Sequence, residues 1–117
     1  MGKRFLIIDD DDSIHNYLEL CLKTMFPESV IDNAYNIRDA TEFLNSKQYQ
    51  MITLDGKLKE GHHGREILSI MSPEQIKKTV VYSGEIDFLS ECQTNNIFAF
   101  SKNSDFDDII MGIKEKL

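Results

Sequence analysis

The polar residues of this sequence that could carry out chemistry stand where short apolar runs end. Five of them share this placement: Asp9, Asp10, Asp55, Ser83 and Lys102. Carboxylates that are packed together raise one another's pKa and destabilise a fold unless a cation neutralises them. An ammonium group comes from Lys102, and carboxylate oxygens are ligands that suit Mg²⁺. We therefore expect the acids, the hydroxyl and the ammonium group to form one cation-dependent site.

The elements that position these residues are apolar runs that predict buried strands. Residues 5–8 are too few for a helix and rich in isoleucine, which is typical of a strand covered on both faces in a parallel sheet. Residues 51–54, 80–82 and 97–100 have the same character, and residues 30–34 predict a short additional strand. The site residues thus follow four of the five expected strands, and only the second strand contributes none.

The segments between the strands carry apolar residues spaced three and four apart, which predicts helices with one buried face. The expected inward residues are Ile14, Tyr17, Leu18, Cys21, Leu22 and Met25; Ile37, Ala40, Phe43 and Leu44; Ile67, Leu68 and Met71; Ile86, Leu89 and Cys92; and Phe106, Ile109, Ile110, Ile113 and Leu117. We expect Asp12 or Ser13 to cap the first helix and Asn36 the second. The Ser-Pro pair at residues 72–73 should end the third helix.

Five strands alternating with five helices predict an α/β fold with a doubly wound five-stranded parallel sheet, because each strand–helix–strand unit crosses over in the right-handed sense. We expect the flavodoxin-like strand order 2-1-3-4-5. In this order the first and third strands flank the switch point, where ligands bind at the carboxyl edge of the sheet. Asp9 and Asp10 should therefore face Asp55 across the crevice, with Ser83 and Lys102 approaching from the other side.

Composition and charge narrow the possible functions. The 117 residues fit one domain, residues 1–117. The formal net charge of -7 argues against direct nucleic-acid binding, which depends on a basic patch. Because the longest apolar run has four residues, we expect no membrane insertion and a cytoplasmic location. Cys21 and Cys92 have no redox or metal-binding spacing and are expected to be reduced, partly buried thiols.

Taken together, the site residues match the pattern of a known family. An acid pair ends the first expected strand, Asp55 ends the third, Ser83-Gly84 ends the fourth and Lys102 follows the fifth. Over its whole length the chain resembles the receiver domain of two-component response regulators. The resemblance implies a (βα)5 fold and a signalling phosphoprotein that accepts a phosphoryl group on Asp55, with no turnover of a separate substrate. The donor would be a phosphohistidine on a sensor histidine kinase or on a histidine phosphotransfer protein of a phosphorelay.

The resemblance also implies a metal site with Mg²⁺ or Mn²⁺. In the family pattern Asp10 and Asp55 would be direct ligands, the backbone carbonyl of Lys57 would be a third, and Asp9 would orient a metal-bound water. The residue types suit these roles, because Mg²⁺ is typically held by one or two carboxylates while it keeps several waters. Phosphoryl transfer needs mostly positioning and charge neutralisation, which such a site provides.

The remaining roles concern the phosphoryl group and the output. The Lys102 ammonium and the Ser83 hydroxyl can both donate to phosphoryl oxygens. In the family the positions of Lys57 and Glu85 tune the attack of water on the phosphoaspartate. Since the sequence ends with the fifth expected helix, we expect no output domain and a regulator that signals by phosphorylation-dependent contact with a target protein.

Four positions depart from the family pattern. Lys59 replaces a proline after Asp55, and Gly64 lies one residue later than expected, so the loop should have a different shape. Asn103 replaces the proline that usually follows the lysine. Ala99 stands where the family has a switching Tyr or Phe, so the aromatic half of the switch should be missing.

The neighbours of Ala99 could replace that aromatic residue only in a shifted strand. Because side chains alternate along a strand, Phe98 and Phe100 should point to the face opposite Ala99. Only a bulge or a one-residue slip in this strand could place Phe98 on the same face of the sheet as Ala99.

Three other functions compete with this interpretation. A haloacid dehalogenase-like phosphatase has the signature DxDx(T/S), which residues 9–13 match, with Asp9 as nucleophile and Asp11 as general acid. That function would need a later acidic motif and would leave Asp55 unexplained. A flavodoxin-like FMN carrier is disfavoured because four aspartates would repel the phosphate. A receiver-like adaptor that signals by binding alone is the third alternative.

The three histidines are given no role in the site. His62 and His63 lie in a loop, residues 56–64, that is expected to be exposed, and they have no partners at metal-ligand spacing. His15 is expected on the polar side of the first helix.

Overall fold

One parallel sheet of five strands runs through the molecule, in the predicted order β2-β1-β3-β4-β5. The structure is a computed structural model that describes residues 2–114 and 117. The strands are β1 (Arg4–Ile8), β2 (Val30–Ala34), β3 (Met51–Leu54), β4 (Thr79–Ser83) and β5 (Phe98–Ser101). Ile8 pairs with Leu54, so β1 and β3 end at the same level and the residues that follow them, Asp9 and Asp55, emerge side by side.

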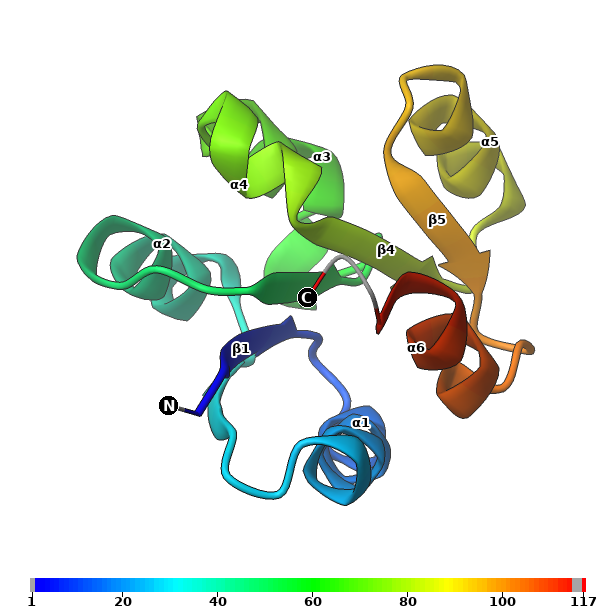
Figure 1. Ribbon diagram of the computed structural model, residues 1–117. Coiled ribbons are helices and arrows are strands. Elements are labelled where there is room, and N and C mark those ends of the chain that lie inside the picture. The colour runs from blue at the N-terminus through cyan, green and yellow to red at the C-terminus, as the bar shows by residue number, and fades with distance from the viewer. Residues whose placement is uncertain (1, 115–116) are drawn as a thin grey trace.

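Helices cover both faces of the sheet. They are α1 (Asp12–Met25), α2 (Ile37–Ser46), α3 (Gly64–Ile70), α4 (Pro73–Lys77), α5 (Ile86–Thr94) and α6 (Phe106–Ile113), with a 3-10 helix η1 (Lys59–Gly61) in the loop after β3. α1 and α6 lie on one face, and α2 to α5 lie on the other (Figure 1). None of the helices in the described part of the chain combines the length and the apolar character needed to cross a membrane.

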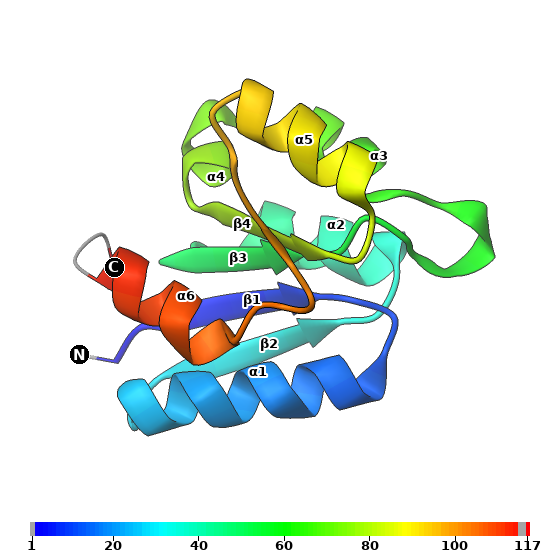
Figure 2. The same cartoon turned by 90° about the vertical axis from the view of Figure 1, so that its right-hand side faces the viewer.

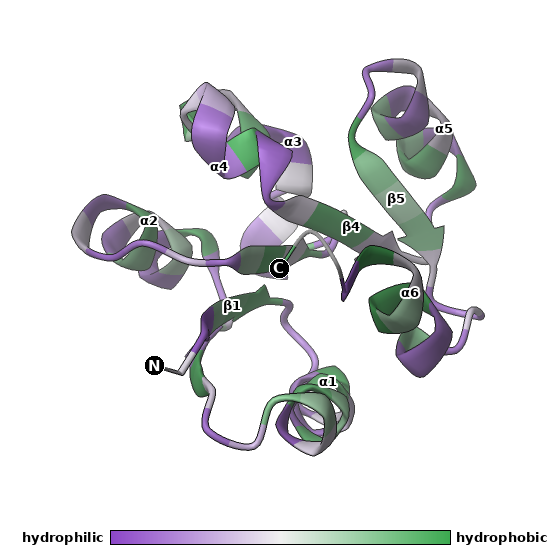
Figure 3. Ribbon diagram, viewed as in Figure 1, coloured by the Kyte–Doolittle hydropathy of each residue, from purple (hydrophilic) through white to green (hydrophobic). Residues whose placement is uncertain are grey.

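Each face of the sheet has its own apolar core. Leu6, Ile8 and Val81 point to the face covered by α2, α3 and α5, whereas Phe5 and Ile7 point to the face covered by α1 and α6. Figure 3 shows the apolar colouring concentrated on the strands, with hydrophilic residues on the connecting turns and on much of the outer helical surface. The strands are buried on both sides, which is why they appear in the sequence as continuous apolar runs.

The two cysteines lie in these two separate cores. Cys21 packs on the α1 and α6 side, and Cys92 packs on the α5 side. Both thiols are buried and free, and burial raises the pKa of each to about 11. Both thiols are more deeply buried than the partly buried thiols that the sequence predicted.

The described residues form one more α-helix than predicted. The Ser-Pro pair does end α3, as expected, but it also begins α4. Ser72 accepts a hydrogen bond from the backbone of Gln75, the Gln75 side chain accepts one from the backbone of Ser72, and Pro73 occupies the first turn. This is a capping box with proline at a favourable position, and it nucleates a helix of only five residues.

The start of α1 also differs from the prediction. Asp11 caps the helix, one residue before the expected Asp12 or Ser13, and its side chain accepts from the Ser13 backbone at 2.9 Å. The predicted cap of α2 is confirmed, because the Asn36 side chain accepts from the Asp39 backbone at 2.8 Å.

Strand β5 keeps a regular register. Its pairing with β4 runs without a shift from Val80 opposite Phe98 to Ser83 opposite Ser101. Ala99 is buried in the core beside Val81, whereas Phe100 packs in the core on the opposite face. The prediction that Ala99 and its aromatic neighbours point to opposite faces is confirmed. The regular register of β5 excludes the slip that would place Phe98 on the face of Ala99.

Candidate functional site

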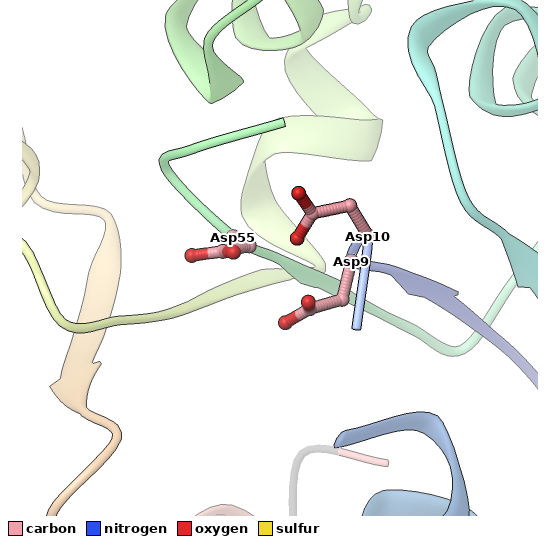
Figure 4. A group of neighbouring side chains, drawn as sticks. All are labelled: Asp9, Asp10 and Asp55. Atoms are coloured by element: carbon pink, nitrogen blue, oxygen red, sulfur yellow. The ribbon is translucent and has the colours of Figure 1, made fainter. Parts of the chain in front are cut away.

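Three carboxylates converge at the carboxyl edge of the sheet. Asp9 and Asp10 leave the end of β1, Asp55 leaves the end of β3, and their side chains extend into the same region (Figure 4). Each offers one oxygen, and these oxygens lie within 4.8 Å of one another. The backbone fixes the positions, because the Asp9 amide donates to the Ala34 carbonyl at 3.1 Å and the Asp55 amide donates to the Ile8 carbonyl at 3.0 Å.

Lys102 enters this group from the end of β5 and contacts two of the acids. Its Nζ lies 2.9 Å from Asp9 Oδ2 and 3.1 Å from Asp55 Oδ2. The Lys102 backbone is held as well, since its amide donates to the Ser83 carbonyl at 3.1 Å. The two acids are almost fully buried, whereas 24% of the lysine side chain is exposed. The lysine is therefore the more exposed member of both ion pairs.

The electrostatics show that one lysine does not neutralise the site. Burial and the neighbouring Asp55 charge raise the pKa of Asp9 to about 6, despite the opposing effect of Lys102. Burial also raises the pKa of Asp55. Burial alone would lower the pKa of Lys102, but its hydrogen bond and charge interaction with Asp9, together with the Asp55 charge, outweigh this and raise it. The site thus holds excess negative charge that a second cation would relieve.

The three acids fit a hard divalent cation. They supply oxygen donors alone, which is the ligand type that Mg²⁺ prefers. The oxygens converge within 4.8 Å, and an ammonium group already bridges two of the carboxylates. The raised pKa values of Asp9 and Asp55 give a physical reason for such an ion to bind.

Ser83 is fully buried on the other side of Asp55. Its Oγ accepts a hydrogen bond from the Glu85 backbone at 3.2 Å. Gly56 lies against both Ser83 and Glu85. A Cβ on this residue would come within 2.9 Å of Ser83 Oγ and 2.4 Å of Glu85 Oε1. Glycine at this position therefore lets the end of β4 approach the residue that follows Asp55.

The loop after Asp55 is a closed structure. Two backbone contacts hold the base of the loop. Lys57 and His63 form an isolated antiparallel β-bridge, and the Gly64 amide donates to the Gly56 carbonyl at 2.7 Å. Lys59 begins the 3-10 helix η1 at the tip, in place of the family's proline. Figure 2 shows this loop projecting beyond the edge at which β1, β2 and β3 end. A Cβ on Gly64 would lie 2.4 Å from the Asp55 carbonyl oxygen, so the start of α3 packs tightly against the site.

His15 supports the acid pair, which the sequence analysis did not predict. It is 2% exposed instead of lying on the polar side of α1. Its Nε2 donates to the Asp9 carbonyl at 2.7 Å, and its Nδ1 lies 2.6 Å from Asn33 Oδ1. The ring also stacks on Tyr35 at 4.1 Å between centroids. The second strand, which was expected to contribute nothing, thus holds the end of β1 through this histidine.

A signal for this buried histidine was present in the sequence. His15, Leu18 and Leu22 are spaced three and four apart and are all buried, whereas Tyr17 of the predicted stripe is 36% exposed. The apolar stripe therefore extends further round the helix than was predicted, and a polar residue occupies part of it.

His63 was likewise given no role, but it connects two loops of the site. Its side chain is 22% exposed, and Nε2 lies 2.7 Å from Glu85 Oε1. The same ring caps α3 by accepting from the Arg65 backbone at 3.1 Å. His62 pairs with Glu66 in a more exposed position, with Nδ1 3.1 Å from Oε1.

Comparison with known proteins supports the fold. No protein-family model matches the sequence, and no curated protein matches it. Among solved structures, the signal receiver domain of a DNA-binding response regulator from Colwellia psychrerythraea is similar, with 25% identity and a TM-score of 0.82, covering 97% of this chain and 96% of that one. A cyanobacterial phytochrome response regulator, RcpA, solved in phosphorylated form, has 19% identity and a TM-score of 0.80, covering 98% of this chain and 93% of that one.

A third similar structure carries a metal. The response regulator TrrA from Thermotoga maritima, in complex with Mg²⁺ and BeF, has 23% identity and a TM-score of 0.81, covering 98% of this chain and 99% of that one. These neighbours are signalling domains, and their agreement confirms that this chain has the fold of a response-regulator receiver domain.

Proposed function

We propose that this chain is a phosphorylatable receiver domain with Asp55 as the phosphoacceptor. The observation that carries the proposal is the position of Lys102, whose ammonium group contacts both Asp9 and Asp55 within a cluster of three carboxylates. An ammonium group between two buried carboxylates, at the ligand-binding edge of this fold, suits the transfer of a highly charged group. The likeness to phosphorylated and Mg²⁺-bound receiver structures supports the same function.

We propose a metal site at the same carboxylates, which the convergence of Asp9, Asp10 and Asp55 supports. Asp10 and Asp55 would hold Mg²⁺ directly together with the Lys57 carbonyl, and Asp9 would orient one of its waters. When bound, Mg²⁺ neutralises the carboxylates and the phosphoryl oxygens that approach them. Asp9 also anchors the turn into α1, because its Oδ1 accepts from the Asp11 backbone at 2.9 Å.

In the transfer step, a carboxylate oxygen of Asp55 attacks the phosphorus of a phosphohistidine. The phosphorus–nitrogen bond breaks, the imidazole keeps the electron pair and an acyl phosphate forms on Asp55. Lys102 contacts Asp55 Oδ2, and the Gly56 backbone donates to Oδ1 at 2.7 Å, so both oxygens are oriented before the reaction. Lys102 and the Ser83 hydroxyl then donate to the phosphoryl oxygens.

The partners follow from this chemistry. The donor is a sensor histidine kinase or a histidine phosphotransfer protein, and the output is a phosphorylation-dependent contact with a target protein. We place this exchange in the cytoplasm, where such kinases and their ATP are found.

Intact-mass measurement tests the proposal. The chain is incubated with acetyl phosphate and Mg²⁺, and we expect one phosphoryl group on the wild type and none on the Asp55→Asn variant. Circular dichroism of the variant checks that it is folded. A wild-type chain that stays unmodified under these conditions contradicts the proposal and favours an adaptor that signals by binding alone.

The same experiment separates the phosphatase alternative. A haloacid dehalogenase-like enzyme would carry its covalent intermediate on Asp9. Phosphate retained by Asp55→Asn but lost from Asp9→Asn would support that enzyme over a receiver domain.

A further inference from the structure

A side-chain contact between His63 and Glu85 joins the loops that follow Asp55 and Ser83. The two residues belong to different elements, since His63 precedes α3 and Glu85 precedes α5. Nε2 of His63 lies 2.7 Å from Oε1 of Glu85, and both side chains are partly buried, with exposed fractions of 22% and 29%. We call this contact the His63–Glu85 bridge.

His63 is fixed from several sides. Its backbone amide donates to Glu66 Oε2 at 2.6 Å, and its Nδ1 accepts from the Arg65 backbone at 3.1 Å. Because Nδ1 accepts a hydrogen bond, the proton of the neutral ring is on Nε2, which can then donate to Glu85. The ring also packs edge-on against Phe88, with 4.7 Å between centroids. The helix cap thus determines which ring nitrogen faces Glu85.

Glu85 in turn lies over the residue next to the phosphoacceptor. A Cβ on Gly56 would come within 2.4 Å of Glu85 Oε1, which places this oxygen directly against the backbone that follows Asp55. The Glu85 backbone donates to Ser83 Oγ at 3.2 Å, so the residue is tied to the hydroxyl proposed to bind the phosphoryl group. The bridge therefore links the two loops beside Gly56 and Ser83.

We propose that His63 is a positioning residue that holds Glu85 over Gly56 and limits the access of water to phosphorylated Asp55. This inference rests on the proposed function and adds a control on the lifetime of the phosphoaspartate. In the step concerned, a water oxygen attacks phosphorus and the bond from phosphorus to the Asp55 oxygen breaks. The carboxylate is regenerated and inorganic phosphate leaves, with the proton released to phosphate or solvent. His63 takes no part in this chemistry and acts only through Glu85.

Two substitutions separate the bridge from the helix cap. The His63→Asn variant keeps a good N-cap residue, but the asparagine side chain is too short to reach Glu85. In the His63→Gln variant, the longer amide can place its NH₂ group near the position of Nε2 and still donate to Glu85, while the cap is weakened. We expect His63→Asn to shorten the lifetime of the phosphoaspartate about fivefold, equivalent to about 1 kcal/mol, and His63→Gln to stay close to wild type.

Variants of Glu85 complete the test. Glu85→Ala should shorten the lifetime as much as His63→Asn does, and the double variant should decay no faster than either single variant, because both remove the same contact. Glu85→Gln keeps an acceptor for Nε2 and should decay like the wild type.

The measurement is a chase by intact mass, in which the protein is phosphorylated with acetyl phosphate and Mg²⁺, the donor is removed and the decay is followed. Decay of His63→Asn at the wild-type rate overturns the inference while leaving Asp55 as phosphoacceptor. Slower decay of Glu85→Gln also overturns it, since the carboxylate would then act on the water itself. A wild type that takes up no phosphate contradicts the proposed function, and the inference with it.

Discussion

The two sides of the site are each held by a histidine, but the two histidines differ in burial. On the side of β1 and α1, His15 is 2% exposed and joins the Asp9 carbonyl to Asn33. On the side of the loops after β3 and β4, the His63 side chain is 22% exposed, and its contact with Glu85 joins two loops, the kind of element that opens most easily. Under the proposed function, this difference predicts that the acid pair is a fixed platform for the metal, whereas the loops rearrange when a phosphoryl group arrives.

The strongest test of this comparison is the loss of stability when each histidine is removed. His15→Ala should lower the free energy of unfolding by about 3 kcal/mol, because it leaves a cavity and removes the donor to the buried Asp9 carbonyl. His63→Ala should cost only about 1 kcal/mol, the value of one helix cap and a partly exposed contact. Urea unfolding without Mg²⁺ measures both. Equal losses would mean that the two sides are equally rigid.

Metal binding should depend on the carboxylates of the site and not on the His63–Glu85 bridge. At about a hundred times its dissociation constant, Mg²⁺ should raise the free energy of unfolding by about 2.7 kcal/mol. Asp10→Asn should lose much of this increment because it removes a proposed ligand. Glu85→Gln is the matched control on the loop side and should keep it. A wild-type melting temperature that does not respond to Mg²⁺ would contradict the metal assignment.

The buried charge of Asp9 makes a separate prediction about pH. Its pKa is about 6 in the folded protein and 3.8 as a free side chain, so the folded state holds the proton more tightly than the unfolded state. Its contribution to stability is therefore greatest below pH 3.8 and is lost as the pH rises through about 6. Without metal above pH 6, Asp9→Asn should be more stable than wild type by about 2 kcal/mol.

The measurement is the difference in unfolding free energy between Asp9→Asn and wild type in EDTA, from about pH 4 to about pH 7.5, a range that crosses the folded-state pKa of about 6. The difference should shrink toward the acidic end, where the wild-type carboxyl is protonated. Other groups that titrate in this range are common to both proteins and cancel. A difference that stays constant with pH would show that the pKa of Asp9 is not raised.

Much of the fold could be predicted because the strands are buried on both faces. Runs such as Phe5 to Ile8 stand out in the sequence, and the parallel strand order β2-β1-β3-β4-β5 brings the carboxyl ends of β1 and β3 side by side. The convergence of Asp9, Asp10 and Asp55 followed from that order. The second helix cap, at Asn36, was predictable because its partner Asp39 is only three residues away.

What could not be predicted depends on partners far apart in the sequence. His15 contacts Asn33, which is 18 residues away, and His63 contacts Glu85, which is 22 residues away. Neither pair produces a periodic pattern, so both histidines were interpreted from their local surroundings alone. The extra helix α4 was missed for another reason, because a Ser-Pro pair can end one helix and begin the next.

The last prediction concerns β5 and α6, where amide exchange should hardly change on phosphorylation. If the loops are the adjustable part, phosphorylation should alter amide exchange in residues 56–64 and 84–86 and leave β5 and α6 nearly unchanged. Ala99 is 4% exposed and packs in the core beside Val81, with no aromatic ring to swing inward. Phe98 is 37% exposed, and the regular pairing of β5 with β4 keeps it on the face opposite Ala99.

Hydrogen exchange with and without acetyl phosphate, in the presence of Mg²⁺, measures this response, and Asp55→Asn treated in the same way is the control. Protection that changes along residues 98–101 and across α6 would contradict the prediction. A shift of β5 by one residue would produce such a change, because it would turn Phe98 to the inner face and make it the missing aromatic switch. A response confined to the two loops would instead mean that a target protein recognises this domain through the segments that follow Asp55 and Ser83.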